Sequence, residues 1–301
     1  MIEARGFTVT PDQDGRRLDR VLRGLYRGVS LGYIMAAIRR GNVRVNGAKS
    51  GGDARLAAGD AVTVPWPAPQ ALDRRIGKRS AGELQTLFKS EDVWILEKPA
   101  GLLSQPDWKS DDSVITRVWS RLSWTRTDFR PALVHRLDRG ASGAIAAALS
   151  GPALRMLSEL VREGMIKKIY LAVVSGIPPK AGEIDLPLLK SENGNMVVVD
   201  DRGKRSITRY RTIGSDGTNA LVEMDLVTGR PHQARVHMAS IGHPIIGDAK
   251  YGGLPAERLF LHACSLTFPD VAGLPRNLRN NTITSKTPRE FALLSKLPEQ
   301  G

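Results

Sequence analysis

A short charged segment between two apolar stretches holds the residues of this chain best suited to catalysis. Residues 133–143 read LVHRLDRGASG, and the apolar run 144–149 follows them. Asp138 lies between Arg136 and Arg139, and positive charge nearby favours the ionised form of a carboxyl group. Loops between buried strands often carry catalytic residues. Asp138 is therefore a candidate nucleophile or general base, and the alternative is a structural ion pair in a surface turn.

Two further segments carry polar residues in apolar surroundings. Tyr170 lies in a strand-like run, Met165–Gly176, where a lone tyrosine is most often a core aromatic with a satisfied hydroxyl. Residues 226–248 contain Arg235 and three of the five histidines. The histidines suggest a metal site, but no HExxH or equivalent carboxylate-bearing helix accompanies them, so we expect no bound metal.

These segments resemble the motifs of the RluA-type pseudouridine synthases. Residues 135–143 resemble the family's HRLD-x-x-[ST]-SG motif, and residues 168–176 resemble K-x-Y-x-A-x-V-x-G. Residues 228–248 resemble TGR-x-HQ-x-RVH…GHP-x-x-GD. Residues 97–102 resemble N-K-P-x-G-[LV], with Glu97 in place of the usual asparagine, and we interpret them as scaffold beside the active site. The resemblance runs from Arg16 to about Phe268 in the family's order.

The resemblance implies conversion of uridine in RNA to pseudouridine without a metal, nucleotide or redox cofactor. The target uridine would leave the RNA helix, and Arg136 would take its place. Asp138 would attack or deprotonate the ribose, after which the uracil detaches, rotates and rejoins through C5. Tyr170 would hold the extruded uracil by stacking. Arg235 would pair with Asp138 and orient it.

One departure from the family pattern keeps a second interpretation open. Gly140-Ala141 replaces the commoner acidic or polar residue followed by threonine, so a hydroxyl that would support the loop of Asp138 is missing. The alternative is a catalytically weakened paralogue that binds ribosomal RNA as a ribosome-assembly factor. A third candidate is a hydrolase that uses Asp138 with His135, and the absence of a nucleophile elbow such as G-x-S-x-G disfavours it.

The start of the chain predicts a small separate unit. Apolar spacing indicates a helix over residues 17–26, and Ser30 and Gly41 are suitable caps for a second helix. Strands are expected around the Asn46-Gly47 turn and at residues 61–64. Residues 16–65 resemble the S4 RNA-binding domain. Its expected phosphate contacts are Arg20, Arg23, Arg27, Arg39, Arg40, Arg44 and Lys49.

Composition agrees with a nucleic-acid partner. The 301 residues carry a net charge of +13 with a pI near 10.2, which favours a polyanion. A single cysteine, Cys264, excludes an intramolecular disulfide. No secretory h-region and no apolar run of about 20 residues is present, so we expect a cytoplasmic protein, or a mature organellar one if the source is eukaryotic.

The predicted organisation is an S4-like domain over residues 1–66, a Pro-rich and then basic linker over 67–88, and a catalytic domain over 89–301. The catalytic domain is expected to be α+β, with a mixed, largely antiparallel sheet and flanking helices. Within it we expect turns at Gly140 and Gly143, a helix over residues 154–163, and an irregular tail beyond Pro269. The resemblance is closest to the RluC-type branch, which implies 23S-type ribosomal RNA, free or in an assembling large subunit, as the partner of a monomer.

Overall fold

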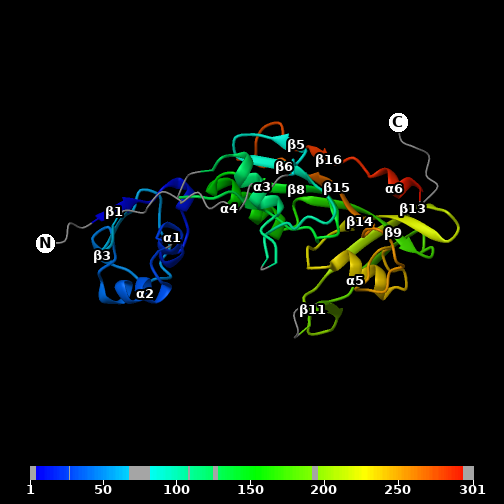
Figure 1. The fold of residues 1–301 in the computed structure, drawn as a ribbon, viewed down its shortest axis with the longest axis horizontal. Coiled ribbons are helices and arrows are strands. Elements are labelled where there is room, and N and C mark those ends of the chain that lie inside the picture. Colours follow the sequence, from blue (N-terminus) through cyan, green and yellow to red (C-terminus); the bar gives the residue numbers. More distant parts are fainter. Residues whose placement is uncertain are drawn as a thin grey trace.

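The computed structural model places a small unit at one end of an elongated molecule and a large sheet at the other (Figure 1). The structure describes residues 5–26, 28–67, 82–107, 109–124, 128–191 and 196–293. Arg27 and residues 68–81, most of the expected linker, lie outside the described residues. Among the described helices none is long and apolar enough to cross a membrane.

The small unit combines an antiparallel sheet of order β1-β4-β2-β3 with two helices. Its elements are β1 (Arg5–Thr8), α1 (Leu18–Leu25), α2 (Leu31–Arg40), β2 (Arg44–Val45), β3 (Ala48–Lys49) and β4 (Ala61–Val64). Both predicted helices are confirmed. The hydroxyl of Ser30 accepts the backbone N–H of Tyr33 at 3.3 Å, and Gly41 ends α2 with a φ of 76°. This left-handed conformation favours glycine, which explains why α2 stops there.

The small unit contacts the large one through the 3₁₀ turn η1 (Pro11–Gln13) and the residue after it, Asp14. The Asp12 carboxylate accepts the backbone N–H of Gly151 at 2.6 Å, at the first residue of helix α4 (Gly151–Arg162). A carboxylate at this position satisfies a free N–H and interacts favourably with the helix dipole. Arg155, one turn into α4, donates to the carbonyl oxygens of Asp14 and Pro11. The sequence patterns did not predict this contact.

The large unit is built on one mixed sheet of order β10-β13-β14-β9-β15-β8-β6-β5, with β7 and β16 paired at its side. Its strands are β5 (Thr86–Lys89), β6 (Val93–Lys98), β7 (Ala132–Leu133), β8 (Ser142–Ala148), β9 (Lys167–Ser175), β10 (Ala181–Asp185), β13 (Ile207–Ser215), β14 (Asn219–Leu226), β15 (Leu261–Thr267) and β16 (Thr282–Thr284). Of its described pairings only β8 with β15 is parallel. The predicted mixed, largely antiparallel sheet is confirmed. A separate hairpin, β11 (Leu188–Lys190) with β12 (Val197–Val199), lies next to α5 (Gln233–Ser240) (Figure 1).

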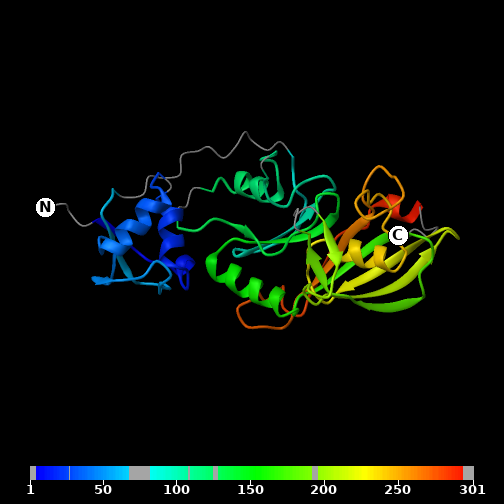
Figure 2. The same ribbon diagram turned by 90° about the horizontal axis from the view of Figure 1, so that it is seen from below.

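Strand β8 forms the centre of the core because both of its faces are buried. Alternate residues point to opposite faces of a strand. Ile145 and Ala147 join a core that includes α3 (Val114–Arg121) and α5, whereas Ala144, Ala146 and Ala148 join a core that includes α4. Figure 2 shows the helices covering the sheet from these two sides. This central strand begins just after the loop of Asp138.

Three expectations need correction. Gly143 lies inside β8 and not in a turn; its φ is 115°, and an added Cβ would overlap the Ala263 carbonyl oxygen on β15. Helix α4 begins at Gly151, before the predicted Leu154, because the Ser150 hydroxyl caps it. The tail is not wholly irregular: β16 pairs with β15, and α6 (Arg289–Leu293) buries Phe291 in the core.

Candidate active site

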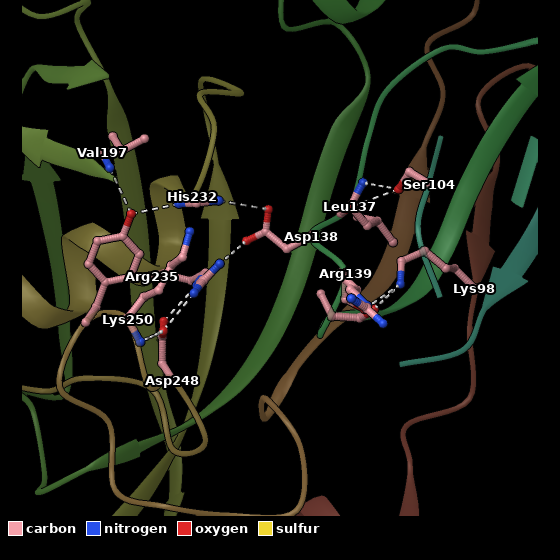
Figure 3. A network of polar contacts seen from close by, with 12 residues as sticks. Lys98, Ser104, Leu137, Asp138, Arg139, Val197, His232, Arg235, Asp248 and Lys250 are labelled. Atoms are coloured by element: carbon pink, nitrogen blue, oxygen red, sulfur yellow. Dashed lines mark hydrogen bonds and ion pairs between the residues drawn. The ribbon is translucent and has the colours of Figure 1, made fainter. Parts of the chain in front are cut away.

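The loop of Asp138 connects β7 to β8 and is fixed by the segment that follows β6. The Ser104 hydroxyl accepts the backbone N–H of Leu137 at 3.1 Å and donates to the Leu137 carbonyl oxygen at 2.7 Å (Figure 3). Farther along the loop, Gly101 N–H donates to the Arg139 carbonyl oxygen at 2.8 Å. The residues on both sides of Asp138 are therefore held through their backbones.

Lys98 reinforces this connection from inside the protein. Lys98 is 0% exposed, and Nζ lies 2.6–3.1 Å from the carbonyl oxygens of Pro99, Leu102, Arg139 and Ala141, among which its N–H groups are shared. Burial lowers the pKa of Lys98 to about 7, with the negative charge of Asp138 acting in the opposite direction. The buried amine thus bonds to both segments, and its hydrogen bonds offset the cost of burying it.

The Gly140-Ala141 departure is accommodated by its neighbours. A Cβ at Gly140 would lie 2.9 Å from the Leu259 Cβ, so the residue that usually occupies this place would collide with the segment before β15. Ala141 is 1% exposed, and its carbonyl oxygen accepts the shortest of the Lys98 hydrogen bonds. The loop is therefore fixed without the missing threonine hydroxyl.

Arg235, on α5, joins two carboxylates. Its Nη1 lies 3.0 Å from Asp138 Oδ2, and its Nε and Nη2 each lie 2.7 Å from an oxygen of Asp248. Burial acts against the charge of Arg235, but the two carboxylates raise its pKa, so the guanidinium stays charged. Because the Asp248 side chain is fully buried, the forked pair fixes the guanidinium in one orientation. The predicted contact between Arg235 and Asp138 is present in the structure.

Tyr170 lies on β9, in the middle of the sheet, between Met224 of β14 and Ala263 of β15. The residue is 7% exposed. Burial and the nearby charge of Asp138 raise the pKa of Tyr170, so its phenol stays protonated at neutral pH. Arg136, two residues before Asp138, is exposed. The structure thus gives the two side chains different surroundings, one inside the protein and one at its surface.

The remaining histidines of the motifs do not form a metal site. His237 bonds to Thr208 and to a backbone carbonyl, and His243 faces the Ser175 carbonyl oxygen. Nowhere in the described part of the chain do three metal-ligating side chains gather. His135 Nε2 accepts the Ala146 N–H at 3.2 Å, so this ring contacts β8. A contact between His135 and Asp138, as the hydrolase interpretation requires, is not seen among the described residues.

The predicted phosphate contacts of the small unit are at the surface. The prediction named six arginines, and the five that the structure describes are exposed: Arg20, Arg23, Arg39, Arg40 and Arg44. They come from α1, the end of α2, and β2. Arg44 also donates to the Gly47 carbonyl oxygen of its own hairpin at 2.9 Å.

Sequence reasoning assigned no role to two residues that support the site: Asp248, and Tyr251, whose hydroxyl oxygen lies 2.7 Å from His232 Nδ1. It interpreted Lys98 and its neighbours as scaffold beside the active site. The sequence offered a signal for Asp248, because it follows Gly247 in a mostly apolar stretch, and a buried carboxylate needs a hydrogen-bonding or charged partner. No local signal distinguishes a lysine that reaches four carbonyl groups from an ordinary surface lysine.

A carboxylate held by a guanidinium, near a protonated phenol, has the chemistry of a nucleophile or a general base. Residues 92–240 match the family model described as RNA pseudouridylate synthase. The ribosomal large subunit pseudouridine synthase C of Pasteurella multocida is 37% identical over 283 residues, covering 87% of this chain and 85% of that protein. The chain belongs to the RNA pseudouridylate synthase family, whose members isomerise uridine to pseudouridine in RNA.

Two further comparisons agree. The ribosomal large subunit pseudouridine synthase D of Zymomonas mobilis subsp. mobilis is 31% identical over 311 residues, covering 96% of each chain. The solved structure of the human RNA pseudouridylate synthase domain containing 4 shares the fold, with a TM-score of 0.56 at 23% identity. It covers 69% of this chain and 90% of its own.

Proposed function

We propose that this protein isomerises specific uridines of large-subunit ribosomal RNA, with Asp138 as the catalytic residue. The observation that carries the assignment of Asp138 is its contact with Arg235 at 3.0 Å, in a loop anchored by Lys98 and Ser104. The names of the relatives in Pasteurella and Zymomonas support the choice of RNA. One relative is a synthase C and the other a synthase D, and the mapping experiment below identifies the uridine that this protein modifies.

The proposed mechanism gives each site residue one task. The target uridine leaves the RNA helix, and the exposed Arg136 fills the space it vacates. Asp138 attacks or deprotonates the ribose, and Arg235 holds the carboxylate in its orientation. The detached uracil rotates against the ring of Tyr170 and rejoins the ribose at C1′ through C5, which restores Asp138 to its starting state; C5 then loses its proton and N1 gains one, so the product is an isomer of the substrate. No metal or cofactor takes part in these steps.

The N-terminal unit is proposed to be an S4-like RNA-binding domain over residues 1–66, followed by a linker over 67–88 and the catalytic domain over 89–301. Its compact core and five exposed arginines support this role. Residues 1–65 carry eleven Lys and Arg side chains against six Asp and Glu. Such a surface binds phosphates and positions the RNA without reading its sequence. We further propose that the protein works as a cytoplasmic monomer.

The alternative of a weakened, non-catalytic paralogue is not favoured. It depended on the missing hydroxyl at Ala141, whereas Lys98 and Ser104 hold the loop through its backbone. The contact between Asp138 and Arg235 would serve no purpose in a protein that only binds RNA. The pair is only partly buried, with side-chain exposures of 11% for Arg235 and 23% for Asp138, and such a pair is weak evidence for a purely stabilising role.

Incubation with unmodified 23S-type ribosomal RNA fragments, followed by chemical mapping of pseudouridine, tests the proposal. We expect modification at one or a few uridines without added metal or cofactor. Binding without modification would instead support the assembly factor, and release of free uracil would support a hydrolase. Modification of transfer RNA alone would retain the enzyme class and reject the ribosomal substrate.

A further inference from the structure

A second side chain faces the carboxylate of Asp138. His232 Nε2 lies 3.9 Å from Asp138 Oδ1, whereas Arg235 holds Oδ2. On the other side of the imidazole ring, Nδ1 lies 2.7 Å from the hydroxyl oxygen of Tyr251. That hydroxyl in turn accepts the backbone N–H of Val197 at 3.0 Å. Figure 3 shows the resulting chain of contacts, which runs from the β11–β12 hairpin to Asp138.

The hydrogen bonds of Tyr251 favour one tautomer of His232. The Val197 N–H occupies an acceptor position of the phenol, so the single O–H of Tyr251 is free to donate to His232 Nδ1. A neutral imidazole that accepts at Nδ1 carries its hydrogen at Nε2. The Nε2–H group therefore points toward Asp138 Oδ1.

The surroundings of His232 keep its ring neutral. Burial lowers the pKa of His232; the charges of Asp138 and Asp248 oppose this effect, and those of Arg235 and Lys250 add to it. At neutral pH the imidazole is therefore a donor at one nitrogen and an acceptor at the other. It can bond to the carboxylate without adding a second full positive charge beside Arg235.

The backbone holds His232 in an uncommon conformation. Its φ is 54° and its ψ is 16°, the left-handed region that few non-glycine residues adopt, and such residues concentrate at functional sites. The adjacent Gln233 fixes this turn: its side chain accepts from the Thr228 hydroxyl at 2.7 Å and from the Arg230 N–H at 3.0 Å. Gln233 also donates to the Ile207 carbonyl oxygen at 2.8 Å.

We propose that His232 is a positioning residue for pseudouridine formation, with its Nε2–H, fixed by Tyr251, donating to Asp138 Oδ1 when RNA fills the site. A side-chain shift of about 1 Å brings the two atoms to hydrogen-bond distance. Each oxygen of Asp138 then has its own donor, so the carboxylate cannot rotate. The inference rests on the proposed role of Asp138. It also makes the hairpin backbone, through Val197, part of the support for the active site.

Two variants at one position test the donor. His232→Leu removes it, whereas His232→Gln keeps an N–H near the place of Nε2, and both side chains bear a similar cost in the left-handed conformation. We expect single-turnover rates at saturating enzyme to fall about 10- to 100-fold for His232→Leu, the size of a lost bond to a charged group. His232→Gln should retain most of the rate. Equal losses in the two variants, or no loss in either, would overturn the proposal.

A spectroscopic measurement tests the tautomer without any assay of activity. Nitrogen-15 NMR of the full chain reports which imidazole nitrogen is protonated, and the His232 signal is assigned by its absence in His232→Gln. We expect protonation at Nε2 in the wild type and loss of this fixed state in Tyr251→Phe, which keeps the ring and removes only the hydroxyl. Protonation at Nδ1 in the wild type would refute the proposal, as would an unchanged tautomer in Tyr251→Phe.

The same experiments distinguish a failure of this inference from a failure of the proposed function. If the wild type forms no pseudouridine, or if Asp138→Asn is fully active, then the assigned function or the assigned catalytic residue is wrong. If the wild type is active, Asp138→Asn is inactive and His232→Leu is as fast as the wild type, then only the role of His232 is wrong.

Discussion

At the scale of single residues, the two oxygens of Asp138 have unequal environments. Oδ2 is bound by Arg235, which Asp248 holds in place, whereas Oδ1 has no partner within hydrogen-bond distance among the described residues. The proposed bond from His232 Nε2, which lies 3.9 Å from Oδ1, would give the second oxygen a donor as well and hold the carboxylate in one orientation toward the ribose.

The first prediction follows from this geometry. Asp138→Asn keeps the shape of the side chain but can neither attack nor accept a proton, so pseudouridine formation should fall by several orders of magnitude. RNA affinity, measured by filter binding, should stay close to the wild-type value. Residual turnover within about tenfold of wild type would remove Asp138 from the mechanism.

The second prediction concerns stability in acid. Burial lowers the pKa of His262, which is 0% exposed, to about 4, and burial likewise lowers the pKa of His135 to about 4. An unfolded histidine titrates near 6.5, so between about pH 6.5 and 4 only the unfolded chain takes up these protons. The stabilising contribution is complete above about pH 6.5 and is lost as the pH falls toward 4.

The size of this effect can be measured by urea unfolding at pH 7, 5.5 and 4.5. For His262 the loss should approach about 3 kcal/mol at the acid end. The variant His262→Gln should be less stable at pH 7, since the hydroxyls of Ser142 and Ser285 lose their partner, but its stability should depend less on pH. An identical pH dependence in the variant would contradict the assignment.

At the scale of elements, Gly143 allows the only described parallel pairing of the large sheet. Its φ is 115°, and an added Cβ would overlap the Ala263 carbonyl oxygen and lie 2.6 Å from the Ala263 nitrogen. Gly143→Ala should therefore lower the free energy of unfolding by at least about 2 kcal/mol, through backbone strain and overpacking together. Gly217→Ala is the matched control, because Gly217 has a φ of 93° with open space around it.

Urea unfolding of both glycine variants separates the two causes. The control should lose only the part that comes from backbone strain, about 1 kcal/mol. If the two variants lose the same stability, the contact with Ala263 contributes nothing, and the close approach of β8 to β15 does not require glycine.

Helices with one exposed face were predicted from the sequence, whereas others were not. Helices α1 and α2 bury one stripe each, so the spacing of their apolar residues is visible. Helix α5 is enclosed on most sides, which removes that signal; its buried residues are Gln233, Ala234, Val236, His237 and Met238. The 3₁₀ turn η1 was missed because its buried residue Asp12 bonds to α4, which lies 139 residues away in the sequence.

The candidate site was predictable only in part, for a similar reason. Asp138 stood out because charges flank it inside an apolar setting, but its partner Arg235 lies 97 residues away and came from the family resemblance. Spacing along the chain cannot determine which arginine meets which carboxylate after folding. Lys98 illustrates this limit, since its four carbonyl partners come from two segments that only the fold brings together.

At the scale of the whole molecule, the basic charge is divided between the two units. Replacing the exposed Arg20, Arg23, Arg39, Arg40 and Arg44 by alanine should weaken binding to structured RNA but leave the chemistry at saturating RNA intact. Each lost phosphate contact removes a released counterion, so the slope of log affinity against log salt should become shallower by about 0.7–0.9 per contact. Binding titrations at salt concentrations between about 50 and 200 mM measure this change.

Arg209→Ala with Arg211→Ala provides the control for that experiment. Both side chains are exposed on the large sheet, but they already pair with Glu183 and Glu223. Their removal should change the salt slope little. If the five N-terminal substitutions also leave the slope of log affinity against log salt unchanged, these arginines of the small unit do not bind RNA.

The contact between η1 and α4 has a consequence for how a target is chosen. Asp12 is attached to the first turn of α4, and α4 follows β8, the strand that begins where the loop of Asp138 ends. The small unit and the loop of Asp138 are therefore connected through η1, α4 and β8. We expect the enzyme to modify a uridine that lies at a particular distance from the RNA element bound by the small unit. An identical uridine one helical step nearer to that element should stay unmodified.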